Sequence, residues 1–343
     1  MNILLAGGAG FIGSHLCDSL VSQDHKVFCA DKFIMGDKNV EHLRLNPNFV
    51  LINCELADSS QVDKLFELGA VDGGFDAVYH LAANSDIQKG GKEPSIDFND
   101  TLLTTRTLLE AMRKHSVSNL FFASTSAVYG DKGDEVLNEQ TGDLRPASYY
   151  GGCKLASEAL ISSYVSMCDM NAVIFRFPNV IGPRLTHGVI YDFIRKLQTD
   201  PTTLEILGNG KQCKPYIYVL DLVEAIVSLT AGFLNTPSTN EAAGAVEMVA
   251  AVENTEKRNC GSEEIYNLSI QGEGTTVTSI ADMVCQEMGL KPTYNYTGGS
   301  VGWKGDVPKF SYDISKVLST GWKPKHTSDE AVRQSVRDAL RKS

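Results

Sequence analysis

Two side chains capable of acid–base chemistry, Tyr150 and Lys154, stand four residues apart in the segment YYGGCK. Oxidation of a secondary alcohol by hydride loss needs a base for the hydroxyl proton, and tyrosine is too basic at neutral pH unless positive charge lowers its pKa. Lys154, one helical turn after Tyr150, can supply that charge. Taken alone, the same spacing is also common for two neighbours on an ordinary helix. We predict Tyr150 as the base, Lys154 as the residue that tunes it, and Thr125, at a strand end, as the residue that holds the substrate oxygen.

A glycine-rich turn near the N-terminus supports this chemistry. The strand-like segment MNILLAG runs directly into GGAGFIG, and a helix-like segment follows. In that context Gly7 and Gly10 allow a tight turn and a close approach of the backbone to a pyrophosphate, and Gly13 allows the helix to pack closely on the strand. The alternative is a glycine-rich turn without a ligand. The context favours dinucleotide binding, and with it hydride transfer at a nicotinamide.

The end of the second predicted strand indicates which dinucleotide is bound. Asp31 follows Gly10 by about 20 residues, where a carboxylate can accept hydrogen bonds from the hydroxyls of the adenosine ribose. The same carboxylate would repel a 2′-phosphate, so NAD is predicted as the cofactor rather than NADP. Lys32, the next residue, weakens this preference slightly.

Short apolar runs alternate with helix-like stretches over the first half of the chain. Several runs are almost wholly apolar, as expected for strands buried on both faces of a parallel sheet. The predicted strands are NILLAG, 26–31, 49–56, 76–83, 119–126 and 172–180, and the predicted helices include 103–115 and 149–167. This alternation predicts an α/β fold with a doubly wound parallel sheet of the Rossmann type.

The alternation ends beyond Asn179, which indicates a change of organisation. We predict an NAD-binding Rossmann domain over residues 1–178 and a smaller C-terminal substrate-binding lobe over 179–343, with some of its elements returning to the first domain. Such a lobe would lie over the carboxyl edge of the sheet, where folds of this type bind ligands. The polar and acidic stretch 236–264 indicates a surface insertion, and the stretch from Ser328 a closing surface helix.

The bulk composition argues against several classes of partner. Of the 343 residues 43% are hydrophobic and 21% charged, as in an ordinary globular protein, and the net charge of −11 argues against a nucleic-acid surface. The eight cysteines form no CxxC pair, which favours reduced thiols in a cytoplasmic protein. The seven histidines show no metal-ligand spacing, so no metal site is predicted. No apolar run reaches the about 20 residues of a membrane span, so no membrane partner is predicted.

Together these motifs resemble those of the extended short-chain dehydrogenase/reductases, and within them the nucleotide-sugar epimerases typified by UDP-glucose 4-epimerase. The resemblance covers nearly the whole chain. It is carried by GGAGFIG, HLAA, STSAVYG, YYGGCK, RFPNVIGPR, YIYVLDLVEA and WKGDVPKFSYDISK followed by GWKP. It implies that NAD takes a hydride from C4 of a nucleotide sugar, with a UDP-hexose as the expected substrate, and returns it to the other face of a 4-keto intermediate.

The resemblance also implies which residues bind each ligand. Thr125, Tyr150 and Lys154 match the catalytic positions of the family. The residues expected at the cofactor are Gly7, Gly10, Phe11, Ile12, Gly13, Asp31, Lys32, Glu55, Leu56, Leu81, Ala82, Ala83, Tyr150, Lys154 and Phe177. The residues expected at the nucleotide sugar are Ser126, Asn179, His187, Val189, Lys214 and Tyr216. A homodimer is expected through helices that flank the site, including the helix of Tyr150.

Differences from related families reduce the number of reactions expected of this chain. The 4,6-dehydratases carry an acidic pair directly after the catalytic threonine, and the uronate decarboxylases carry a glutamate at the second of those positions. Here the two residues are Ser126 and Ala127, which have no carboxyl group for these proton transfers. Epimerisation or simple oxidation at C4 remains. The open alternatives are a nucleotide-sugar dehydrogenase or 4-keto reductase, an epimerase at another carbon, and a non-catalytic NAD-binding sensor or scaffold.

The nucleotide-sugar pocket is expected to differ from that of the family. Lys214 and Trp303 take the places of two diphosphate-binding arginines, and lysine keeps the charge but not the bidentate fork. Phe310 falls near the position that selects the substituents of the sugar. A bulky ring there favours hexoses without a 2-acetamido group.

Overall fold

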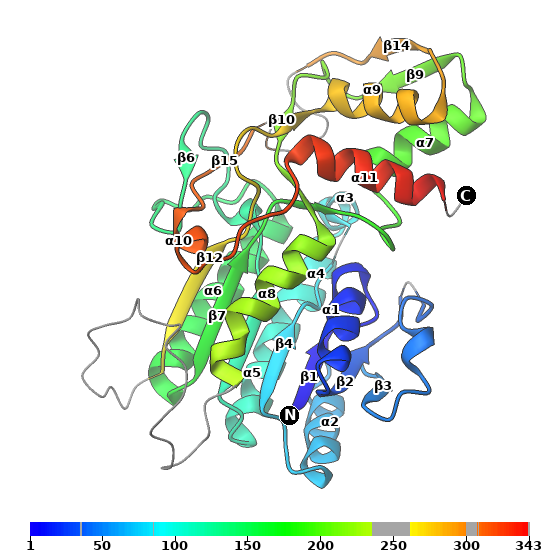
Figure 1. Ribbon diagram of the computed structural model, residues 1–343. Helices are drawn as coiled ribbons and strands as arrows, with labels where there is room; N and C mark the ends of the chain where they lie inside the picture. Colours follow the sequence, from blue (N-terminus) through cyan, green and yellow to red (C-terminus); the bar gives the residue numbers. More distant parts are fainter. Residues whose placement is uncertain (35, 85, 235–260, 300–306, 308, 342–343) are drawn as a thin grey trace.

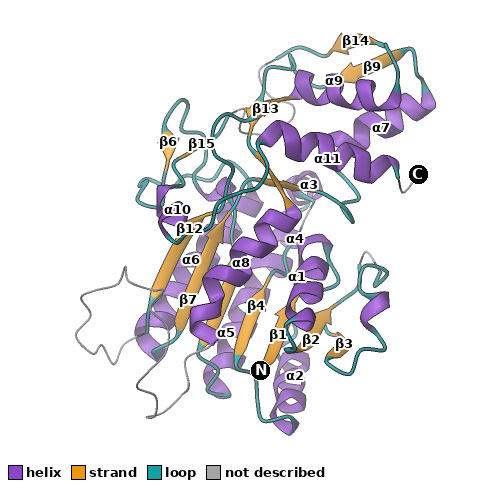
Figure 2. Ribbon diagram, in the orientation of Figure 1, coloured by secondary structure: helices purple, strands orange, loops and turns teal. Residues whose placement is uncertain are grey.

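The computed structural model describes residues 1–34, 36–84, 86–234, 261–299, 307 and 309–341. Within these residues seven parallel strands form a central sheet in the order β12-β7-β5-β4-β1-β2-β3 (Figures 1 and 2). Their bounds are β1 (Asn2–Ala6), β2 (Lys26–Asp31), β3 (Phe49–Asn53), β4 (Ala77–His80), β5 (Asn119–Ala123), β7 (Asn171–Arg176) and β12 (Glu263–Asn267). The strand order reverses between β1 and β4, as in a doubly wound Rossmann sheet, so the predicted fold class is confirmed.

Helices cover both faces of the sheet. One face carries α1 (Phe11–Ser22), α8 (Val219–Leu234) and α10 (Ser315–Ser319). The other face carries α2 (Ser59–Val71), α5 (Thr104–Lys114) and α6 (Tyr149–Cys168). Figure 1 shows α1 and α8 in front of the strands and α6 behind them.

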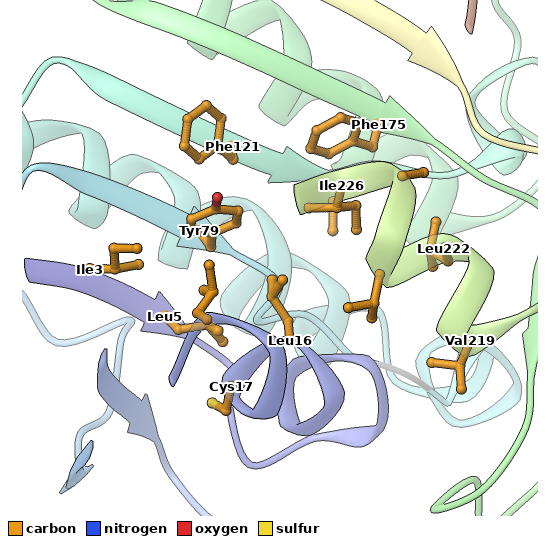
Figure 3. Packing of buried hydrophobic residues seen from close by; sticks show 14 of the residues in the cluster. Ile3, Leu5, Leu16, Cys17, Tyr79, Phe121, Phe175, Val219, Leu222 and Ile226 are labelled. Carbon is orange, nitrogen blue, oxygen red and sulfur yellow. The ribbon is translucent and has the colours of Figure 1, made fainter. Parts of the chain in front are cut away.

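The alternation of side chains along β1 explains why both faces need cover. Ile3 and Leu5 point into the cluster beneath α1 and α8, whereas Leu4 and Ala6 point into the cluster on the opposite face. Figure 3 shows Leu5 beside Leu16 of α1, with side chains of α8 approaching from the same side. A strand that is apolar on both faces is stable only between two layers of helices.

A smaller group of elements lies above the carboxyl edge of the sheet (Figure 2). It contains α7 (Val189–Thr199), α9 (Val277–Met288), α11 (Ser328–Leu340), β9 (Thr203–Ile206) and β14 (Thr293–Tyr296). These elements share a hydrophobic cluster of their own, which includes Phe193, Leu204 and Val332. The helix α11 begins with a capping box between Thr327 and Glu330.

Short elements join the two groups and surround the carboxyl edge. The parallel pair of β8 (Asn179–Ile181) and β11 (Tyr216–Tyr218) and the antiparallel pair of β10 (Cys213–Lys214) and β13 (Thr275–Thr276) connect the groups. Around the edge lie α3 (Ile87–Lys92), α4 (Pro94–Asp97), a π-helical segment (Phe98–Leu103), β6 (Val136–Leu137) and β15 (Ser311–Tyr312).

The strand β12 corrects one expectation from the sequence. Residues 236–264 were expected to form a surface insertion, but Glu263 and Glu264 begin β12, which pairs with β7. Residues 236–260 lie outside the described residues, as does Trp303. The strand escaped prediction because it lies at the sheet edge and starts with two glutamates, so its apolar run is short.

None of the helices within the described ranges is long and apolar enough to cross a membrane.

A buried ion pair joins the sheet to α6. Arg176, the last residue of β7, donates to the Glu158 carboxylate through Nη2 at 2.6 Å and through Nε at 3.1 Å. The two side chains are 5% and 6% exposed. Arg176 also donates to the Tyr129 hydroxyl at 3.2 Å, and Glu158 accepts a hydrogen bond from the Ser124 hydroxyl. Because both charges have left water, each depends on the presence of the other.

The Arg176→Gln variant should lower the free energy of unfolding by about 3–5 kcal/mol, because it leaves the Glu158 charge buried without its partner. Arg113→Gln breaks an exposed pair with Glu110 of 3.0 Å, and should cost less than about 1 kcal/mol. Urea unfolding followed by circular dichroism compares the two. Equal losses would contradict the role of the buried pair.

Candidate functional site

The turn after β1 brings two backbone segments very close together. Gly7 has a φ of +82°, and a Cβ added to it would lie 2.6 Å from the backbone nitrogen of Ala82, just after β4. A Cβ on Gly13 in α1 would lie 2.2 Å from the carbonyl oxygen of Gly7. Glycine is required at both positions because the neighbouring atoms are backbone. The turn thus occupies the point where the strand order reverses, at which folds of this type bind ligands.

The start of α1 is suited to an anionic group. Its N-cap, Gly10, makes no side-chain hydrogen bond to the first turn. The N–H groups at the start of α1, beginning with Phe11 and Ile12, therefore stay available together with the positive end of the helix dipole. A Cβ on Gly10 would meet, within the described residues, only the Gly7 carbonyl oxygen at 3.3 Å, so the turn is open on this side. These features fit the pyrophosphate of a dinucleotide.

Asp31, the last residue of β2, lies next to the glycine turn. Its Oδ2 accepts a hydrogen bond from the Ala9 N–H at 3.1 Å, and its Oδ1 accepts one from the Phe33 N–H at 2.8 Å. Burial raises the pKa of Asp31, and these backbone donors act in the opposite direction. Each carboxylate oxygen keeps a lone pair, so Asp31 can still accept hydrogen bonds from ribose hydroxyls.

The other residues expected at the cofactor lie at the ends of neighbouring strands. They are Lys32 after β2, Glu55 and Leu56 after β3, Leu81, Ala82 and Ala83 after β4, and Phe177 after β7. Since the carboxyl ends of parallel strands meet at one edge, the fold brings this set to the same side of the sheet as the glycine turn.

The helix α6 starts very close to the end of β5. The Ser148 hydroxyl caps it by accepting a hydrogen bond from the Gly151 N–H at 3.1 Å. A Cβ on Gly151 would lie 2.7 Å from the carbonyl oxygen of Ala127, so any larger residue would push the helix outward. The glycine lets Tyr150 and Lys154 reach the strand end.

The three predicted catalytic residues meet at this point. The Tyr150 hydroxyl lies near Thr125, which follows β5 and acts to lower the pKa of Tyr150. Lys154, one turn further along α6, is 2% exposed and donates to the Ala123 carbonyl at 2.6 Å. His80 is the last residue of β4. Its pKa is lowered mainly by burial and in addition by the nearby positive charge of Lys154. The cluster therefore lies across β4 from the glycine turn.

Burial is the largest influence on the pKa of Tyr150 and on the pKa of Lys154. It raises the pKa of Tyr150 to about 12, against the lowering effect of Thr125. It lowers the pKa of Lys154 to about 7, against the attraction of Glu158. The Lys154 ammonium lies 4.6 Å from the centre of the Phe122 ring. The protein alone thus leaves Tyr150 a weak acid, so the expected lowering of its pKa needs a further positive charge.

A buried carboxyl group next to the cluster was not found from the sequence. Asp97 is fully buried, and its Oδ1 accepts a hydrogen bond from Asn84 Nδ2 at 2.8 Å. Its Oδ2 has no hydrogen-bond partner among the residues described. Burial raises the pKa of Asp97, and its charge contributes to the raised pKa of Tyr150. A single aspartate in the segment PSID belongs to no motif, so no sequence signal could have identified it.

Asp97→Asn should lower the pKa of Tyr150 from about 12, because a nearby negative charge that opposes phenolate formation is removed. A pH titration of ¹³C-tyrosine-labelled protein by NMR measures this, with the signal assigned through Tyr150→Phe. Asp86→Asn serves as a control, because Asp86 caps α3 and asparagine caps almost equally well. An unchanged pKa in Asp97→Asn, or an equal fall in both variants, would contradict the assignment.

The residues expected at the nucleotide sugar lie on the side of the smaller group of elements. Ser126 directly follows Thr125, and its N–H donates to the Phe177 carbonyl at 3.1 Å. Asn179 and Tyr216 are register partners in β8 and β11. The fold thus brings Ser126 close to the segment that leads into Asn179.

Three further expected residues come from separate elements of that side. Lys214 lies in β10, whereas His187 and Val189 lie at the start of α7, with His187 exposed.

An aromatic group lies beside Ser126. The ring centres of Phe310 and Tyr312 lie 6.1 Å apart, and the two rings stack with an interplanar angle of 20°. The ring centre of Tyr129 lies 6.5 Å from that of Tyr312. Burial raises the pKa of Tyr312, and Ser126 acts in the opposite direction, which places the phenol beside Ser126. Phe310 was expected near the sugar, but Tyr312 was not, because only the pairing of β15 with β6 brings it there.

Known proteins resemble this chain in sequence and in fold. The model of the NAD dependent epimerase/dehydratase family matches residues 3–237. A UDP-glucose 4-epimerase of Corynebacterium glutamicum is 28% identical, over 99% of this chain and 94% of its own. A UDP-N-acetyl-alpha-D-glucosaminuronate decarboxylase of Bacillus cytotoxicus is 36% identical, over 66% of this chain and 70% of its own. The solved structure of Thermus thermophilus UDP-glucose 4-epimerase in complex with NAD matches with a TM-score of 0.78 and 29% identity, over 98% of each chain.

Proposed function

The chain belongs to the NAD-dependent epimerase/dehydratase family, and we propose that it is a nucleotide-sugar 4-epimerase that uses NAD and acts on a UDP-hexose. One observation carries the proposal. Thr125, Tyr150 and Lys154 gather at the end of β5, one strand away from the glycine turn, while the two residues after Thr125 are Ser126 and Ala127. The site therefore has the groups for proton transfer at one sugar oxygen and lacks acidic groups for further chemistry at these positions.

The proposed mechanism moves one proton to and from Tyr150. NAD⁺, which the glycine turn and Asp31 would hold, would supply a reversible acceptor for the C4 hydride of the sugar. Tyr150 takes the proton of the C4 hydroxyl, while Thr125 holds the same oxygen by a hydrogen bond. After the 4-keto sugar has turned its other face, Tyr150 returns the proton. No net oxidation results, because each transfer is reversed at the same carbon.

The pKa of about 12 for Tyr150 explains why positive charge is needed. At neutral pH the phenolate would be rare in the protein alone. In a pocket of low dielectric constant a positive charge lowers the pKa of a phenol more than it would in water. We propose that Lys154 and the oxidised nicotinamide supply this charge together.

Other reactions of the family fit the site less well. A decarboxylase such as the Bacillus cytotoxicus relative resembles the chain in sequence, but Ser126 and Ala127 offer no carboxyl group for the additional proton transfer. A dehydrogenase or 4-keto reductase would use the same three catalytic residues. A non-catalytic NAD-binding scaffold would have no need of Tyr150 and Lys154, which both lie in the site.

Tyr150→Phe should slow the interconversion of UDP-glucose and UDP-galactose by about 10²–10⁴-fold, because phenylalanine cannot accept the proton. It should still bind NAD, since the glycine turn is intact. Tyr149→Phe is the matched control: the side chain is adjacent in sequence but 56% exposed, and activity should stay normal. NMR of the two sugar nucleotides measures conversion, and chromatography of denatured protein measures bound NAD.

Near-normal conversion by Tyr150→Phe would refute the assignment of the base. A lasting absorbance change at 340 nm after the wild-type protein meets substrate would instead identify a dehydrogenase or reductase. Cofactor binding without conversion of any UDP-, dTDP-, GDP- or CDP-sugar would favour the scaffold.

We further propose a homodimer that forms through α6 and the π-helical segment packed on it. Phe98 and Met167 on these elements are 52% and 83% exposed. Exposed apolar side chains on two elements that pack together can contribute to one interface. Met167→Glu combined with Phe98→Glu should give a monomer in size-exclusion chromatography with light scattering. Leu45→Glu, which changes a 97% exposed leucine elsewhere, should leave the mass unchanged, and a dimer in the double variant would contradict the proposal.

We place the protein in the cytoplasm because its described cysteines are free thiols. We propose that residues 1–178 bind the cofactor and that the elements of 179–343 above the sheet edge bind the nucleotide sugar. Asn179, His187, Val189, Lys214 and Tyr216 are its proposed ligands there.

A further inference from the structure

Lys32 lies at the adenosine end of the proposed cofactor site and is held by two carboxylates. Its Nζ lies 2.6 Å from Oδ1 of Asp100, in the π-helical segment, and 3.4 Å from Oε2 of Glu55, after β3. The side chains of Lys32, Glu55 and Asp100 are 30%, 39% and 19% exposed. Three separate elements thus meet around one ammonium group directly after Asp31.

This ammonium group would otherwise be suited to a phosphate. A cation beside the ribose-binding carboxylate is what distinguishes sites that accept a 2′-phosphate from sites that reject it. Lys32 is also protonated at neutral pH: burial lowers its pKa, but the hydrogen bond and charge of Asp100, with help from Glu55, outweigh burial and raise it. The charge is therefore present, but it is engaged by carboxylates.

The net negative charge around Lys32 also disfavours the binding of a 2′-phosphate. Asp31, Glu55 and Asp100 each carry a negative charge against the single positive charge of Lys32. A 2′-phosphate entering this group would meet net repulsion, and it would also have to displace Asp100 from the ammonium. The Asp100 contact is partly shielded from water, so its loss costs more than that of a fully exposed ion pair.

We propose that Asp100 and Glu55 make the protein selective for NAD over NADP by holding Lys32, which is a latent ligand for the 2′-phosphate. The inference rests on the proposed function, because it assumes that the glycine turn and Asp31 bind a dinucleotide. It assigns cofactor selectivity to a residue of the π-helical segment, almost 70 positions from the motif that binds the ribose. Asp31 then rejects the phosphate directly, and Asp100 rejects it by keeping Lys32 occupied.

Equilibrium titration of the purified protein with NAD⁺ and with NADP⁺, followed by isothermal calorimetry, tests the inference without any activity measurement. Asp100→Asn should tighten NADP⁺ binding by roughly two- to fivefold, the effect of one ion pair near a protein surface. Its NAD⁺ affinity should change much less, because Asp100 is not an expected cofactor contact. Adding Glu55→Gln should tighten NADP⁺ binding further. The gain should shrink as salt is raised.

Two further variants separate the latent ligand from simple loss of repulsion. In Asp100→Asn combined with Lys32→Ala, the gain in NADP⁺ affinity should disappear. Asp63→Asn removes the same charge from an ion pair with Lys114 on α2 and α5, and should leave the ratio of the two affinities unchanged. A gain that survives the loss of Lys32, an equal gain in Asp63→Asn, or no gain in Asp100→Asn would each overturn the inference. The NAD⁺ affinity of the wild-type protein, measured in the same titrations, tests the proposed cofactor separately.

Discussion

The burial of the Lys154 ammonium is the constraint on which the rest of the site depends. A charged group with 2% of its surface exposed and a backbone carbonyl as hydrogen-bond acceptor is costly to keep. Glu158, one turn further along α6, offsets part of this cost and is itself held by Arg176 and Ser124. The helix that carries Tyr150 is therefore joined to β5 and β7 by a polar network as well as by apolar packing. Precise placement of the phenol follows from this network.

One short segment links the two ends of the proposed cofactor site. The residues from α4 to the end of the π-helix pack against α6. Asp97 in this segment acts on Tyr150 at the reacting end, and Asp100 engages Lys32 at the adenosine end. A π-helix changes the direction of side chains by inserting an extra residue in a turn, and such segments are frequent at functional sites. Asp97 precedes the π-helix and Asp100 lies within it, so two nearby aspartates act at different ends of the proposed cofactor site.

The sequence alone was sufficient for the architecture because the relevant signals are local. The apolar runs identify every strand of the sheet except β12, and the glycine turn with its flanking strand and helix identifies the switch point. The same holds for Tyr150 and Lys154, whose spacing places them on one face of a helix. The edge strand β12 was missed because its signal depends on pairing with β7, a contact between distant residues.

The site residues that escaped sequence reasoning share one property: their environment comes from tertiary contacts. Asp97 is an ordinary aspartate until α4 packs against α6. Asp100 becomes relevant to the site only through its ion pair with Lys32. Tyr312 reaches the site only through the pairing of β15 with β6. The raised pKa of Tyr150 could not be predicted from the sequence either, because its main cause is burial, and burial is a property of the whole fold.

The order of elements along the chain has a consequence for biosynthesis. Tyr79, Phe121 and Phe175 point toward the face of the sheet that α8 covers, and the Tyr79 hydroxyl meets Thr230 of that helix at 2.6 Å (Figure 3). On the ribosome these rings emerge well before residues 219–234 do. A large apolar surface is therefore open in the nascent polypeptide until the later part has been translated, and partly made chains are prone to aggregation at that stage.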